Sequence, residues 1–197
     1  MTLLAEPKTT TQHLAPRVAE LSAAVAGAGL IVLHLVQPDL DPGWSVVSQY
    51  ALADSGWLMS VVFILLAIAC SALALSLPSD RLHRAGRVGR VLLLVSTIGL
   101  LIAAAFVVGN PLHDVGSLLG NLGLAVAAVL IGRDLRRGLP DGPRRWSAAA
   151  AHAPWISAVV MGAFLGTATW GIGLLNRAVV LAYIVWIIVA ARQARRG

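Results

Sequence analysis

Residues 37–59 form the longest stretch of the chain that is neither an apolar run nor an arginine cluster. Three of the nine acidic residues and two of the six tryptophans lie in it, and it contains no lysine or arginine. The acids are Asp39, Asp41 and Asp54, and the tryptophans are Trp44 and Trp57. Carboxylates gathered in one short segment can orient a base, hold a metal ion or pair with an arginine. We therefore expect specific recognition by this protein to be built around this segment.

A second polar group lies between two apolar runs, in residues 110–114. If the apolar runs are helices that cross a membrane, this connection is too short to leave the membrane surface. His113 and Asp114 should then lie at the mouth of the helix bundle. Asp114, Ser117 and Asn121 then recur at i, i+3 and i+7, which places them on one face of a helix. A polar face in a membrane span should point to the bundle interior or to a wet cavity, because contact with lipid costs more. This face predicts a pocket.

A third polar group is Asn176 and Arg177 at the start of the last apolar run. Fourteen residues separate Arg177 from Arg192; they span about 21 Å of helix, less than the hydrocarbon thickness of about 30 Å. A cation at the bilayer centre costs about 2.5–3.5 kcal/mol on insertion scales, so Arg177 should have a carboxylate partner. The candidate partners on the same side of the membrane as Arg177 are Asp39, Asp41, Asp54 and Asp114. Among them we expect Asp39 or Asp114 to pair with it.

Two histidines lie near these groups. His34 is near the end of the first apolar run and shares a face with small residues, so it should point inward. Facing histidines in a bundle can ligate a metal or a haem, and His34 with His113 would be such a pair. The alternative is a neutral histidine bonded to a neighbouring backbone or hydroxyl group. No spaced ligand motif accompanies the pair, so we predict no cofactor and keep metal or haem as the minor alternative.

The composition indicates a polytopic membrane protein. The 197 residues are 58% hydrophobic and only 12% charged, whereas soluble domains are about 45–50% apolar and 25% charged. The net charge of +6 is therefore not read as a nucleic-acid signal. The single cysteine, Cys70, lies in an apolar run, which excludes an intramolecular disulfide and favours a small core residue.

Six apolar runs approach or reach the length that a helix needs to cross a bilayer. They cover residues 18–36, 56–77, 88–108, 115–131, 148–170 and 171–191. None shows the two-residue alternation of a membrane barrel. The predicted fold is all-α, a bundle of six transmembrane helices in one domain over residues 18–192, with a flexible tail at 1–17 and a basic tail at 193–197.

The basic residues predict the orientation. With six spans, both termini and the loops at 78–87 and 132–147 lie on one side, together with fourteen of the fifteen lysines and arginines. Short basic loops stay in the cytoplasm, so both termini should be inside and residues 37–55 outside. The inner arginines either fix this topology alone or also recognise anionic lipid head groups. Small residues at Gly116 and Gly120, and at Gly162 and Gly166, favour packing within the chain and leave a homo-oligomer open.

The polar segments also resemble those of a known family. The resemblance rests on Gln37-Pro38-Asp39 to Trp44-Ser45, on Ser48-Gln49-Tyr50-Ala51-Leu52, on Gly56-Trp57-Leu58-Met59, on His113-Asp114 and on Asn176-Arg177. Together they are similar to a bacterial six-span membrane family known only as domain of unknown function 998. Two positions depart from its pattern: Gln49 stands where the family tends to have glutamate, and Ala53-Asp54 replaces a usual glycine. The resemblance implies a multi-pass protein of the bacterial inner membrane and supplies no chemistry.

The sequence favours a membrane protein with an outward-facing polar pocket for a lipid head group or a small molecule. The predicted pocket residues are Asp39, Asp41, Trp44, Ser48, Tyr50, Asp54, His113, Asp114, Asn121 and Arg177. The alternative is an intramembrane enzyme that acts on a lipid or isoprenoid at the outer leaflet. Its base or metal ligand would be His113, with Asp39, Asp41 or Asp114 orienting it or holding a metal. A transporter or an accessory subunit is the third reading, and no motif identifies the reaction or the ligand.

Overall fold

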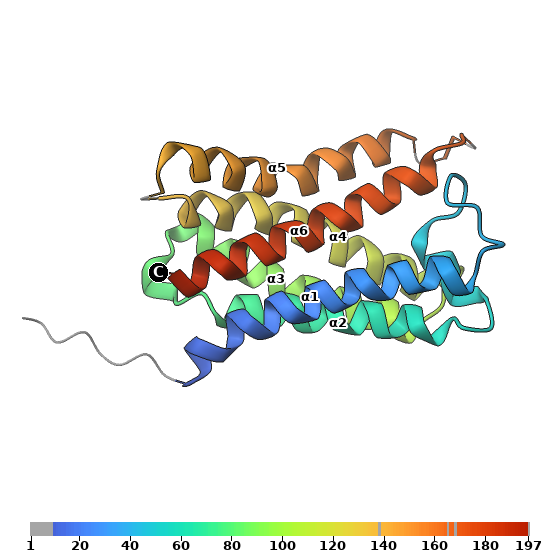
Figure 1. Ribbon diagram of the computed structural model, residues 1–197, viewed down its shortest axis with the longest axis horizontal. Coiled ribbons are helices and arrows are strands. Elements are labelled where there is room, and N and C mark those ends of the chain that lie inside the picture. The colour runs from blue at the N-terminus through green and yellow to red at the C-terminus, as the bar shows by residue number, and fades with distance from the viewer. Residues whose placement is uncertain (1–9, 138, 165, 168, 197) are drawn as a thin grey trace, which may run out of the picture.

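The structure is a computed structural model that describes residues 10–137, 139–164, 166–167 and 169–196 (Figure 1). These residues form six long α-helices and two short 3₁₀ helices and contain no strand. The long helices are α1 (Thr10–Val36), α2 (Trp57–Leu75), α3 (Arg84–Ala105), α4 (Pro111–Leu135), α5 (Asp141–Phe164) and α6 (Ile172–Arg196). The short ones are η1 (Val47–Leu52) and η2 (Ser79–Arg81). The predicted all-α class is confirmed.

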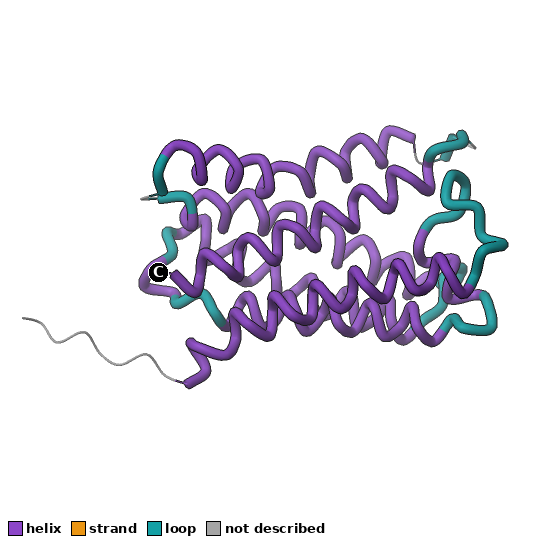
Figure 2. Tube along the Cα trace, in the orientation of Figure 1, coloured by secondary structure: helices purple, strands orange, loops and turns teal. Residues whose placement is uncertain are grey.

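All six long helices are long and apolar enough to cross a membrane, so the chain is a multi-pass membrane protein. Each helix packs against the next one in the chain, and α6 closes the ring by packing against α1. Figure 2 shows that the connecting loops gather at two ends of the bundle. We call the end with residues 37–56 the loop end and the opposite end, where α1 begins and α6 finishes, the termini end.

Glycines set the closest packing in the bundle, between α3 and α4. A side chain at Gly99 would lie 2.5 Å from the backbone nitrogen of Gly120 and 2.6 Å from the carbonyl oxygen of Gly116. Two helix backbones can approach this closely only where small residues face each other. The pair at Gly116 and Gly120 therefore packs within the chain, while Gly162 has open space around it.

Several helix boundaries differ from the sequence-based expectation. The first helix begins at Thr10, so residues 10–17 continue a helix that was expected to start at 18. Near this end, Glu20 of α1 pairs with Arg192 at 2.7 Å and with Arg195 at 2.9 Å, which ties α1 to the last turns of α6. Residues 193–196 likewise continue α6. Residues 1–9 and 197 lie outside the described part.

The fifth helix is displaced toward the N-terminus and ends at Phe164, although a span over 148–170 was expected. The connector that follows contains Gly166 with φ +88° and Gly171 with φ +104°. Side chains other than glycine rarely adopt such angles, so these glycines end one helix and allow the next to start. At the start of α4, the Asn110 side chain accepts a hydrogen bond from the amide of Leu112 at 2.9 Å, and Pro111 opens the helix.

Candidate functional site

The loop at residues 37–46 is held against the start of α6 by backbone contacts. The carbonyl of Gly43 accepts hydrogen bonds from the amides of Gly171 at 2.9 Å and Gly173 at 3.0 Å. A side chain at Gly173 would lie 2.3 Å from the carbonyl oxygen of Pro42, so only glycine fits there. The loop therefore has one fixed position over this end of the bundle.

Arg177 connects four segments at the loop end. Its Nη1 donates to the carbonyls of Pro42 at 3.1 Å, Ser45 at 2.5 Å and Gly173 at 3.0 Å. Its Nη2 donates to the hydroxyl of Tyr50 at 3.0 Å, and the guanidinium carbon lies 5.6 Å from the centre of that ring. Tyr50 is fully buried. The expectation that Arg177 pairs with Asp39 or Asp114 is thus wrong, because backbone carbonyls and neutral side chains accept its hydrogen bonds.

His34 belongs to the same network as a neutral acceptor. Its Nε2 accepts from Nε of Arg177 at 2.7 Å, so its Nδ1 carries the proton and donates to the carbonyl of Leu30 at 2.8 Å. Both ring nitrogens therefore have partners, and the ring lies 5.2 Å from that of Tyr50. Binding a metal or haem iron through His34 would require breaking one of these bonds.

His113 lies elsewhere, under the end of α3. It is 2% exposed, and its Nδ1 donates to the carbonyls of Ala103 at 3.1 Å and Phe106 at 2.8 Å. Its ring meets Phe63 edge to face at 5.9 Å. His113 thus satisfies carbonyls that the end of α3 leaves open. No group of three or more potential metal ligands occurs among the described residues.

The acidic residues of the predicted pocket face outward. Asp39, Asp41, Asp54 and Asp114 are all exposed. The carboxylate of Asp41 accepts from the amide of Gly43 at 2.6 Å, which shapes the turn of the loop. The structure therefore does not bring these acids together with His113.

A cavity of about 210 Å³ lies below residues 46–48, surrounded by α2 to α6. Most of its wall is apolar, from Phe63 on α2 to Val180 on α6. Its polar side chains are those of Ser48, Ser117, Asn121, Asn176 and Tyr183. Of the ten predicted pocket residues, only Ser48 and Asn121 line this cavity.

The polar groups of the cavity fall into two sets. Asn176 and Tyr183 support the wall: Asn176 Oδ1 accepts from the amide of Val47 at 2.8 Å, and Tyr183 donates to the carbonyl of Asn121 at 2.9 Å. The amide nitrogen of Asn121 is bonded to the carbonyl of Ser117 at 2.7 Å. Within the described part of the chain, the hydroxyls of Ser48 and Ser117 and the amide oxygen of Asn121 accept or donate no further hydrogen bond. These three oxygens are available to a ligand.

The family model described as "Protein of unknown function (DUF998)" matches residues 21–193, which include parts of all six helices. The chain belongs to the DUF998 family. No curated protein and no solved structure shows a significant match to it.

In this DUF998 protein, Gln49 has a structural role that the sequence did not suggest. Its side-chain oxygen accepts a hydrogen bond from the backbone amide of Val46 at 2.9 Å, and its backbone amide donates one to the carbonyl of Val46 at 3.0 Å. This reciprocal pair starts η1, and a glutamate would supply the same acceptor. The glutamine therefore stabilises the first turn of η1.

Sequence reasoning missed Tyr183 as a cavity residue and used Asn176 only as the neighbour of Arg177. Both lie on α6 with Val180, at spacings of i, i+4 and i+7, so they share one helix face. A polar pair at that spacing in an apolar run is the signal that could have identified them. That face points to the same cavity as the polar face of α4.

Proposed function

We propose that this DUF998 protein binds a small uncharged amphiphile, either a free molecule or the end of a membrane lipid, in the cavity below residues 46–48. The observation that carries the proposal is the combination of an apolar wall with three available oxygens, on Ser48, Ser117 and Asn121. Apolar pockets with a few placed polar groups are the usual form of small-molecule sites.

The residues that line the cavity also indicate which class of ligand it would bind. None of the described residues that line the cavity is charged. Two hydroxyls can donate or accept, and the amide oxygen can only accept, so a ligand hydroxyl or amide would be matched. The volume of about 210 Å³ is below the roughly 300–1,000 Å³ typical of drug-sized ligands. A whole lipid is therefore not expected inside, and the site suits one polar end with a short aliphatic body.

The proposed setting is the outer leaflet of a bacterial inner membrane. The basic residues predict that the termini end is cytoplasmic, which places the loop end and the cavity outside. The loop at 37–46, with Trp44 half exposed at 51%, would then cover the cavity from the aqueous side. Its exposed acids would face water and take no part in binding.

Removal of the available oxygens tests this proposal. The variant combines Ser117→Ala with Asn121→Leu; the backbone carbonyl of Asn121 that binds Tyr183 is retained. Each lost hydrogen bond is worth about 0.5–1.5 kcal/mol, so the loss of two should lower the affinity by about 5- to 150-fold. The control is Ser71→Ala, which removes a hydroxyl bonded within its own helix, to the carbonyl of Ile68 at 3.0 Å.

The measurement is mass spectrometry of small molecules and lipids that co-purify with each variant at equal protein amounts. We expect an uncharged amphiphile with the wild type and the control, and at most about one fifth of it with the double variant. Equal amounts in all three proteins would contradict the proposal. A co-purifying molecule with a charged group at the bound end would contradict the assignment of the ligand class.

A further inference from the structure

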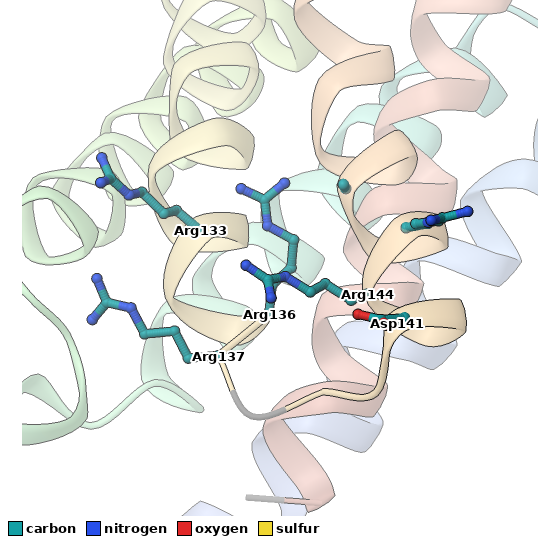
Figure 3. Close-up of a pocket in the computed structure, with 7 residues that line it drawn as sticks. Arg133, Arg136, Arg137, Asp141 and Arg144 are labelled. Carbon is teal, nitrogen blue, oxygen red and sulfur yellow. The ribbon is translucent and has the colours of Figure 1, made fainter.

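Arginines line a separate cleft at the termini end, between the end of α4 and the start of α5. Its volume is about 550 Å³ (Figure 3). The charged residues that line it are Arg133, Arg136, Arg137, Asp141, Arg144 and Arg145. Figure 3 shows guanidinium groups from both helices around this space. Five cations and one carboxylate make it the most one-sided charge cluster among the described pockets.

Most of these arginines have no internal counter-ion. Arg137 pairs with Asp134 at 3.3 Å. Over residues 10–137, 139–164, 166–167 and 169–196, the other four arginines of the cleft form no ion pair. Like charges so close together repel one another unless an anion lies between them. Guanidinium groups match phosphate oxygens with two parallel hydrogen bonds, so phosphate is the anion that this lining fits.

An apolar groove of about 680 Å³ runs between the same two helices. It is lined on α4 by residues such as Leu122, Val126 and Leu130, and on α5 by residues such as Trp155 and Val159. The indole nitrogen of Trp155 donates to His152 at 2.9 Å, so these two polar groups satisfy each other and leave the wall apolar. Val126 is 46% exposed and Val159 61% exposed, so the groove faces the surroundings of the bundle.

The groove and the cleft adjoin. Leu130 precedes Arg133 by three residues on α4, and Ala148 of the cleft precedes His152 of the groove by four on α5. Each pair therefore lies one helical turn apart on a shared face. From Leu122 to Arg133 the helix rises about 16 Å, about half of the hydrocarbon thickness. An acyl chain confined to one leaflet has the same reach.

We propose that this face of α4 and α5 binds an anionic phospholipid, with the phosphate among the cleft arginines and an acyl chain in the groove. Charge complementarity selects the head group, and the continuous apolar groove distinguishes a lipid from a free phosphate. Basic pockets at the cytoplasmic ends of membrane helices bind such head groups. This site is at the opposite end from the cavity below residues 46–48 and does not depend on the function proposed for that cavity.

The test uses the full chain, stripped of lipid in an uncharged detergent. Binding of phosphatidylglycerol, cardiolipin, phosphatidylcholine and inorganic phosphate is measured by native mass spectrometry and by the shift of the unfolding temperature. Each basic residue near a membrane surface strengthens binding of anionic lipid about fivefold. Arg136→Gln with Arg144→Gln should therefore weaken binding of the two anionic lipids about 30-fold. The control is Arg84→Gln with Arg87→Gln, which removes two exposed arginines near the same end but outside the cleft.

The groove is tested with Val159→Trp, which fills it, against Val160→Trp, which adds the same bulk to an exposed neighbour outside the lining. Only the first should reduce binding of phosphatidylglycerol. Equal binding of phosphatidylcholine, or equal stabilisation by inorganic phosphate, would overturn the proposal. So would equal losses in the cleft variant and its control, or a change of oligomeric state in Val159→Trp without loss of lipid.

Discussion

Replacement of Arg177 by glutamine should strongly destabilise the protein, because one guanidinium joins α1, the loop, η1 and α6. Its loop acceptors can be hydrated after the change, but the hydroxyl of Tyr50 is fully buried and His34 is partly buried. A hydrogen bond to a charged group contributes about 1.5–3 kcal/mol, so the two interior bonds together give about 3–6 kcal/mol. For a protein of this size, about 2–4 °C is lost per kcal/mol, so the unfolding temperature should fall by about 6–24 °C.

The assay is thermal unfolding in detergent, followed by tryptophan fluorescence. Trp170, one of the six tryptophans, packs against Gly43 of the loop, so part of the signal reports on the loop end. Arg177→Lys should lose about half of the effect, since an ammonium keeps the charge but cannot reproduce the planar set of donors. The matched control is Arg192→Gln at the other end of α6. The side chain of Arg192 is exposed, so its ion pair with Glu20 should contribute no more than about 1 kcal/mol to the free energy of unfolding.

Double variants decide whether the partners of Arg177 are the ones described above. The effects of Arg177→Gln and Tyr50→Phe should fall short of additivity by about 1 kcal/mol or more, because both remove the same bond. With Asp39→Asn or Asp114→Asn, the effects should add within about 0.5 kcal/mol, since these acids are exposed and do not contact Arg177. A larger coupling to either acid than to Tyr50 would refute the carbonyl and tyrosine network.

Three further outcomes are expected. Gly99→Ala should cost about 1–3 kcal/mol in thermal unfolding, because the added methyl would lie 2.5 Å from the backbone of α4, whereas Gly162→Ala should be tolerated. Asp134→Ala should cost about 1–3 kcal/mol in the same assay, because this carboxylate is 5% exposed and accepts a backbone amide at 2.9 Å. In intact cells, a membrane-impermeant maleimide should label Asp39→Cys and spare Arg84→Cys until the cells are permeabilised; the reverse pattern would place the loop end in the cytoplasm.

The helices were predictable because hydropathy over a long window is a strong signal. The same signal places boundaries poorly where an apolar sequence continues past a helix end. Residues after Phe164 stay apolar, so the expected span ran on to 170, while the positive φ of Gly166 and Gly171 ends and restarts the helix. Hydropathy does not report this backbone requirement.

The site was predicted less well than the fold, for a physical reason. Sequence reasoning assigned a carboxylate to Arg177 because it considered the charge of the side chain and not its hydrogen-bond donors. A guanidinium has five N–H donors, and three carbonyls, a hydroxyl and an imidazole nitrogen supply acceptors without bringing a second charge out of water. The acids of the loop were left free to remain hydrated at the surface.

The polar face predicted on α4 agrees better with the structure than the predicted partner of Arg177 does, because the polar face was inferred from helical spacing. Asn121 and Ser117 line the cavity, while Asp114, at the first turn of the same helix, is exposed. The remaining wall comes from residues distant in sequence, and Asn176 joins it to the loop through the amide of Val47 at 2.8 Å. Because Arg177 is the next residue, one turn of α6 both anchors the loop and positions Ser48 over the cavity. The loop is thus a fixed cover whose position depends on its attachment to α6, and its own acids contribute only to its local turn.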